Sequence, residues 1–138
     1  MTRNFALSEF IESRFFNPDQ QEKVWKSFRD DEAKLLPNAK KLAKNLQVLR
    51  DHFGRPISVN IAYRPKWYEL LKGRKGGSKH VSFMAADIVV DGVSPDDVAD
   101  AIELLIEQGK MAEGGLGRYS SFTHYDIRGK KARWDFRK

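Results

Sequence analysis

The spacing of apolar residues changes at Gly54, and this change constrains the fold more than any other feature of the sequence. Before Gly54, apolar residues recur every three or four positions, which is typical of amphipathic helices. After Gly54 they alternate as in half-buried strands, with one further helical stretch inserted. This order predicts an α+β fold in which a small, mostly antiparallel sheet packs against helices. We expect a single domain over residues 1–138, because the chain shows no repeat or linker and its length suits one core.

Prolines, glycines and capping residues set the expected limits of the helices. Asn17 followed by proline is a favourable helix start, and a helical run over residues 19–36 follows, which Pro37 is expected to end. Another helix should open at residues 94–97 and end at Gly109. Between them, a helix ending at Gly54 is predicted by a stripe of apolar residues: Leu42, Leu46, Leu49 and Phe53.

The second half of the chain is expected to contain the sheet. Segment 72–79 is basic and rich in glycine, so we expect a loop there. Strands are predicted in five segments: 56–61, 85–90, 116–119, 122–127 and 132–136.

Composition excludes several kinds of site. The chain has no cysteine, which rules out disulfides, thiolate metal sites and cysteine nucleophiles. Its 25 Lys and Arg outnumber its 19 Asp and Glu, and the formal charge of +6 favours anionic partners without choosing among them. No stretch has the length and apolarity of a membrane span, so we expect no membrane insertion. The first residues show no apolar core of a signal peptide, so we expect synthesis in the cytoplasm.

The chain has only three histidines, which limits the choice of metal ligands. His52 lies near a predicted helix end, where we expect a surface residue favoured by the helix dipole. His80 follows the glycine-rich loop, Asp87 lies seven residues further on, and His124 falls in a predicted strand. Two imidazoles and a carboxylate suffice to hold catalytic zinc with a fourth position open to water. Spacing alone leaves purely structural roles open for these residues.

One segment resembles a known family. Ser78 and His80, then six residues, then Asp87 and Ile88 resemble the signature of the zinc D-alanyl-D-alanine metallopeptidases. Those enzymes share the Hedgehog/DD-peptidase fold, which the resemblance therefore implies here. Three further segments resemble the family in the same order: 46–57, 61–64 and 114–134. Residues 4–10 resemble the start of small phage-borne members. Together they cover most of the chain, apart from a helical region around residues 15–37.

The resemblance implies a role for particular residues. His80, Asp87 and His124 would be the ligands of Zn²⁺, and no small organic cofactor is expected. Arg64 would bind a substrate carboxylate or the oxyanion that develops on a peptide carbonyl, a task suited to a guanidinium. A surface position at a strand end remains the alternative for Arg64.

Two further residues are implied to lie near the substrate. Ser78 would be a supporting polar group beside the metal, and Tyr63 directly precedes Arg64 in the matching segment. A plain loop position remains the alternative for Ser78.

The chain departs from the family pattern at several positions. Phe83 stands three residues after the first ligand, where the family usually has glycine. Many members have a glutamate or aspartate as general base three residues before the last histidine, and others have a histidine two residues before it. This chain has Ser121 and Phe122 there. A serine and a glycine of the family are replaced by Ile61 and Ala62. The resemblance therefore identifies no group for proton transfer.

Asp126 is the best remaining candidate for that task. It lies two residues beyond His124, so the two side chains share one face of a strand. Asp126 would act as a base through a water molecule, or it would orient the histidine. Of these two roles we favour orientation. Glu69 and Glu113 are weaker candidates for the base.

These features predict zinc-dependent hydrolysis of peptide bonds in peptidoglycan stem peptides. Both a D-Ala-D-Ala carboxypeptidase and an L-Ala-D-Glu-type endopeptidase fit, and we expect a monomer. The enzyme would be a phage endolysin released by a holin, or a component of the virion. One alternative is an inactive relative that binds the cell wall or has a structural role in a phage.

The second alternative is a basic nucleic-acid-binding domain. It rests on loop 72–79 and on the tail 128–138, where Trp134 and Phe136 alternate with cations as in single-strand binders. A solvated loop and a last strand with inward-packed aromatics explain the same residues, and we favour that explanation.

Overall fold

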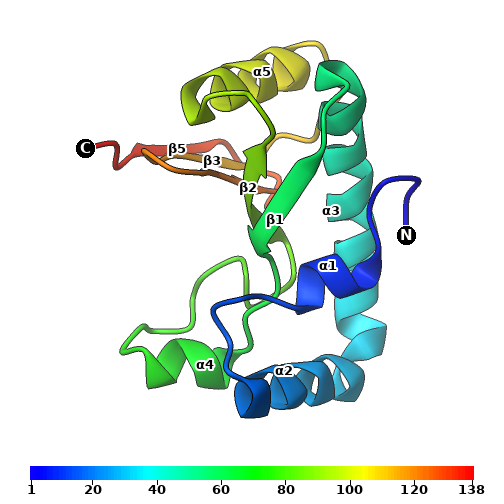
Figure 1. The fold of residues 1–138 in the computed structure, drawn as a ribbon, viewed down its shortest axis with the longest axis vertical. Coiled ribbons are helices and arrows are strands. Elements are labelled where there is room, and N and C mark those ends of the chain that lie inside the picture. The colour runs from blue at the N-terminus through cyan, green and yellow to red at the C-terminus, as the bar shows by residue number, and fades with distance from the viewer.

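The computed structural model describes all residues, 1–138, and has an α+β fold, as predicted (Figure 1). The first 53 residues contain three helices and no strand, and the rest of the chain contains five strands and two helices. The elements in chain order are α1 (Leu7–Ile11), α2 (Pro18–Asp30), α3 (Glu32–Phe53), β1 (Ile57–Ile61), α4 (Lys66–Leu71), β2 (Ala85–Val90), α5 (Pro95–Glu107), β3 (Gly115–Arg118), β4 (Thr123–Asp126) and β5 (Ala132–Asp135).

The five strands form one sheet in the order β1-β2-β4-β3-β5. All neighbouring strands are antiparallel except β3 and β5, which are parallel. In Figure 1, α3 runs along β1 and β2, α5 lies at one end of the molecule, and α2 and α4 lie at the other. The last strand, β5, is at the sheet edge, and its one aromatic residue, Trp134, packs on His124 of the candidate site described below.

The predicted end of the first long helix at Pro37 is wrong. The break falls at Asp31, and Pro37 lies inside α3, in its second turn. Proline removes one hydrogen bond, the one to the carbonyl of Ala33. Both residues are exposed, so water can satisfy that carbonyl and the helix continues. Helices α1 and α4 were not predicted, because five or six residues are too few to show a helical period.

One apolar core joins the two halves of the chain. Its cluster of buried side chains extends from Phe5 to Ile127 and includes Leu42, Leu46 and Leu49 of the predicted stripe, while Phe53 is half-buried and packs against it. Alternate residues of β2, such as Ile88, point into this core, while Asp87 points to the opposite face. His52 is exposed at the end of α3, as expected. No helix combines the length and the apolar character that crossing a membrane requires.

Phe83 has a left-handed backbone, with φ of 63°, in the turn that follows His80. Glycine adopts this conformation freely, whereas a residue with a side chain is strained in it. The phenyl ring is fully buried and stacks on Tyr63, with 5.2 Å between ring centroids and 10° between planes. Here, therefore, aromatic packing offsets a strained backbone.

Replacing Phe83 tests this balance. We expect Phe83→Ala to lower the free energy of unfolding by about 3–5 kcal/mol, because it removes a buried ring. Phe83→Gly should be at least as stable as Phe83→Ala, because only alanine retains the roughly 1–2 kcal/mol penalty of a left-handed residue. Urea unfolding of the two variants measures the difference. A glycine variant clearly less stable than the alanine variant would contradict the strained backbone.

Candidate metal centre

Strand register brings Asp87 and His124 side by side. Asp87 of β2 pairs with Ile61 of β1 on one side and with His124 of β4 on the other. The same row continues through Gly117 of β3 to Trp134 of β5. Directly paired residues in adjacent strands project to the same face. The sheet therefore presents a carboxylate, an imidazole and an indole in one line.

Gly117 makes room for the indole in that row. A Cβ atom at this position would lie 2.3 Å from Nε1 of Trp134, which is closer than real contacts allow. With glycine there, the Trp134 ring packs on His124 with centroids 4.9 Å apart, and its Nε1 donates to the Tyr119 hydroxyl at 2.9 Å. Trp134 thus covers one side of the histidine. The sequence pattern alone placed Trp134 only as an inward-packed or nucleic-acid-binding aromatic.

His80 reaches the site from the loop between α4 and β2. Its carbonyl accepts hydrogen bonds from the amides of Arg64 and Phe83, both at 3.2 Å. Its Nδ1 lies 2.6 Å from the carbonyl oxygen of Ala62, which can only accept, so Nδ1 carries the proton. The free nitrogen, Nε2, lies 3.4 Å from Oδ1 of Asp87. The turn therefore aims one basic nitrogen at the carboxylate.

In His124 the two ring nitrogens have the opposite roles from those in His80: Nδ1 faces Asp87 and Nε2 faces away from it. Its Nε2 lies 2.8 Å from Oδ2 of Asp126, and its Nδ1 lies 3.0 Å from Oδ1 of Asp87. One ligand atom from each of His80, Asp87 and His124 lies within 4.8 Å of the other two. This arrangement can hold a divalent metal through two nitrogens and one oxygen, and all three groups are buried or nearly so.

Asp126 is fully buried, and both of its oxygens have partners. The Arg128 guanidinium donates to both, at 2.8 and 2.7 Å, and the Gly115 amide donates to Oδ1 at 2.9 Å. Gly115 is required for this approach, because a Cβ atom there would lie 2.2 Å from Oδ2. The structure thus places Asp126 behind His124, in contact with its outer nitrogen.

The ionisation of His80, Asp87 and Asp126 suits metal binding, whereas His124 has to lose a proton to bind a metal. Burial lowers the pKa of His80, which favours the neutral ring that a metal requires. Burial opposes ionisation of Asp87 and Asp126, yet hydrogen bonds from their partners hold both pKa values far below the usual range. Burial also lowers the pKa of His124, but its contacts with Asp126 and Asp87 outweigh this and raise the pKa. A metal would therefore replace a proton on Nδ1 of His124.

Arg64 lies beside this centre and is anchored by Glu69. Arg64 Nε is 2.9 Å from Oε1 of Glu69, in an ion pair without hydrogen-bond geometry. Arg74 pairs with the other oxygen of the same fully buried carboxylate. Ser78 links the two parts of the site, because its hydroxyl accepts from the His80 amide at 3.2 Å and from Arg64 at 3.4 Å. Glu69 is thus a structural counter-ion.

Two cavities meet at Asp87. The first, of about 360 Å³, lies toward α4, and the second, of about 540 Å³, includes His80 and His124 in its wall. They share Arg64, Asp87 and Phe122. Asp87 is the only carboxylate among the residues that line either cavity.

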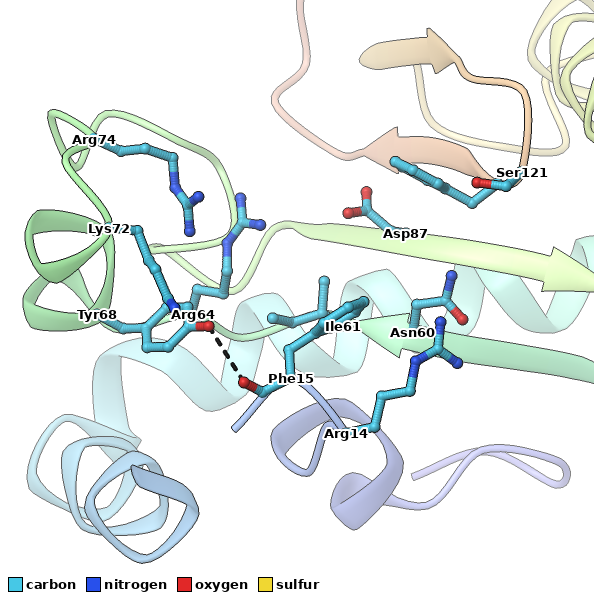
Figure 2. A pocket seen from close by; sticks show the side chains of 11 residues that line it. Arg14, Phe15, Asn60, Ile61, Arg64, Tyr68, Lys72, Arg74, Asp87 and Ser121 are labelled. Carbon is cyan, nitrogen blue, oxygen red and sulfur yellow. Dashed lines mark hydrogen bonds between the residues drawn. The ribbon is translucent and has the colours of Figure 1, made fainter. Parts of the chain in front are cut away.

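Ser121 and Phe122, where the related family has proton-transfer groups, both line the first cavity (Figure 2). Ser121 is exposed there and faces the same space as Asp87. Tyr63 is not brought to either cavity. Its ring is buried against Phe83, and burial raises the pKa of its hydroxyl to about 12.

All three arginines of the C-terminal tail are engaged in ion pairs, whereas its three lysines are not. Arg128 pairs with Asp126, Arg133 with Glu103 and Glu113, and Arg137 with Asp96 and Asp135. Glu113 is therefore occupied by an arginine, and its pKa is lowered by contacts that outweigh desolvation. This pairing weakens the case for the tail as a nucleic-acid site.

Comparison with known proteins agrees with this arrangement. No curated protein and no solved structure matches the chain. A family model described as Peptidase M15 matches residues 16–126, which is most of the sequence and includes all three candidate ligands. The chain belongs to the peptidase M15 family.

Proposed function

We propose that the protein is a zinc peptidase that hydrolyses peptide bonds in peptidoglycan stem peptides. The observation that carries this proposal is the convergence of His80, Asp87 and His124 at the junction of two cavities. Membership of the peptidase M15 family supports a metallopeptidase activity. The substrate rests on the resemblance to enzymes that act on cell-wall peptides.

The residues present fit zinc. Two buried imidazoles and one carboxylate form the usual protein share of a catalytic zinc site, and the second nitrogen of each ring is already hydrogen-bonded, which fixes the rings. When bound, zinc lowers the pKa of a coordinated water to about 7 and polarises a carbonyl. Other first-row metals suit the same ligands, and metal content decides among them.

Arg64 and the two cavities determine how a peptide would lie. The Arg64 guanidinium lines both cavities, so it can bind a substrate carboxylate or the oxyanion near the metal. Space on both sides of Asp87 allows a peptide to continue past the scissile bond, which favours an endopeptidase of the L-Ala-D-Glu type. A D-Ala-D-Ala carboxypeptidase would leave one cavity largely unused.

Asp126 acts in this proposal as a positioning residue. Its oxygens are directed to His124, Arg128 and Gly115, and none is exposed to a cavity, so contact with a substrate proton is blocked. A carboxylate that receives the outer nitrogen of a ligand histidine fixes the ring and raises its basicity.

We expect Asp126→Asn to weaken zinc affinity by about 10–100-fold, because the amide cannot neutralise Arg128 or hold His124 in the same tautomer. Competition with a chelating dye measures the affinity. If excess zinc restores the wild-type kcat, Asp126 acts through the metal site, whereas an unchanged zinc affinity would contradict its positioning role.

The proposed activity is tested with purified peptidoglycan. The wild-type protein should release new amine groups, a chelator should stop the release, and added zinc should restore it. Mass spectrometry of the products then identifies the bond. Zinc binding without amine release from walls of several chemistries would favour the inactive relative.

One specific observation favours that alternative. With Ser121 in the usual position of the base, the walls of both cavities contain no carboxylate except Asp87. Such a protein would hold metal and bind cell wall but cleave slowly or not at all. Delivery to the wall, as a holin-released endolysin or a virion component, rests on the resemblance of residues 4–10 to small phage-borne members.

A further inference from the structure

The first cavity carries more positive charge than the proposed reaction uses (Figure 2). Its wall contains Arg14, Arg64, Lys72 and Arg74. The only opposing carboxylates are Asp87, a candidate metal ligand, and Glu69, which is buried beneath two of the arginines. Arg64 alone suffices for the carboxylate or oxyanion contact described above.

Arg14 and Lys72 account for the excess. Both are exposed, and neither forms an ion pair with any carboxylate of the protein. The Arg14 guanidinium lies 5.0 Å from the ring centroid of Phe15, and Nζ of Lys72 lies 5.5 Å from that of Tyr68. Such contacts hold a cationic side chain in place without neutralising its charge.

The two cations stand on connected walls of the same cavity. Arg14 comes from the segment between α1 and α2, and Lys72 directly follows α4. The Tyr68 hydroxyl donates to the carbonyl of Phe15 at 3.4 Å, which joins these walls (Figure 2). Figure 2 shows Arg14 beside Asn60 at one end and Lys72 at the other. The apolar side chains of Phe15 and Ile61 lie between the two cations.

We propose that this cavity binds a second carboxylate of the substrate, and that Arg14 and Lys72 make the protein select peptides with at least two carboxylates. The proposal rests on the peptidase function given above and specifies its substrate. A volume of about 360 Å³ accommodates a small peptide segment, and its apolar floor suits the carbon chain between two charged groups. A carboxamide in place of the second carboxylate forfeits the charge attraction, so the selectivity is electrostatic.

The test uses two stem-type peptides that differ only in whether one carboxylate is replaced by a carboxamide. Zinc-loaded wild-type protein should bind the carboxylate form about tenfold more tightly, the effect of one charge-assisted hydrogen bond. In the double variant Arg14→Gln and Lys72→Gln, we expect a preference below about twofold. Calorimetry gives the affinities, and the same peptides give kcat/KM.

A matched control removes two positive charges elsewhere. Lys40 and Lys44 are exposed on α3, far in sequence from the cavity wall and not part of it. The variant Lys40→Gln with Lys44→Gln has the same net charge as the cavity variant and should keep the tenfold preference. All four positions are exposed, so neither variant should lose its fold.

The outcomes separate this inference from the proposed function. Equal affinity and equal cleavage of both peptides by the wild type would overturn the subsite and leave the peptidase standing. A preference in binding that only the cavity variant loses, without cleavage of either peptide, would support the subsite and count against the peptidase. A DNA oligonucleotide that displaces the peptide at lower concentration than the dicarboxylate would overturn the subsite in favour of nucleic-acid binding.

Discussion

Replacing Ser121 by glutamate is expected to raise the rate of peptide hydrolysis by about 10²–10⁴-fold, the usual contribution of a positioned general base. Ser121 is exposed and faces the same cavity as Asp87, and no other carboxylate lines that space. A glutamate side chain introduced there would place a second carboxylate in the cavity that Asp87 lines. Initial rates of amine release at saturating zinc measure the gain.

Ser121→Gln is the control for this variant, because glutamine has nearly the same shape and cannot accept a proton. It should leave the rate near that of the wild type. If Ser121→Glu and Ser121→Gln behave alike, the missing base at this position does not limit the reaction. Proton transfer would then not depend on a carboxylate at this position.

Replacing Arg64 by glutamine should have the opposite effect, lowering kcat/KM by about 10²–10³-fold, the typical loss for one donor to a developing oxyanion. Arg64 is the one cation that lines both cavities next to Asp87 and is only 18% exposed. Its loss also leaves the fully buried Glu69 with Arg74 as its single partner. We therefore expect a lower free energy of unfolding as well, by about 1–3 kcal/mol.

A double variant separates these two effects. Arg64→Gln combined with Glu69→Gln removes the buried carboxylate that has lost one of its two cationic partners, and it should recover most of the stability, while kcat/KM stays low. Urea unfolding and peptide kinetics on the same preparations make the comparison. If activity returns together with stability, Arg64 has a structural role only, and its assignment to the substrate would be withdrawn.

The sequence predicted the sheet, and the three residues that meet as candidate metal ligands, better than it predicted their surroundings. The alternation in 85–90 and the register rules place Asp87 and its neighbours on one face, and the mostly antiparallel sheet is confirmed. The predicted end of the first long helix at Pro37 was wrong, because an exposed proline near a helix start destabilises the helix less than a proline in a buried turn.

The sequence singled out Arg64 and the basic loop 72–79, but it did not predict the cationic cavity that they form with Arg14. Arg14 and Lys72 are 58 positions apart and belong to segments with no regular period, so only the folded chain shows them in one wall. The ion pairs of Glu69 with two arginines could not be predicted either, because these residues also lie in segments without a regular period. A glycine in a strand often marks a place where a neighbouring group approaches closely, so Gly117 could have indicated that the Trp134 ring lies over it. That inference requires the parallel pairing of β3 with β5, which the sequence does not show.

The most direct measurement of the central claim is zinc content, taken together with amine release from peptidoglycan, for the wild type and two histidine variants. His80→Ala removes a candidate ligand, and His52→Ala removes the exposed histidine at the end of α3. We predict about one zinc per chain and amine release in the wild type and in His52→Ala, and loss of both in His80→Ala. Equal zinc content in all three proteins, or amine release that survives in His80→Ala, would contradict the account.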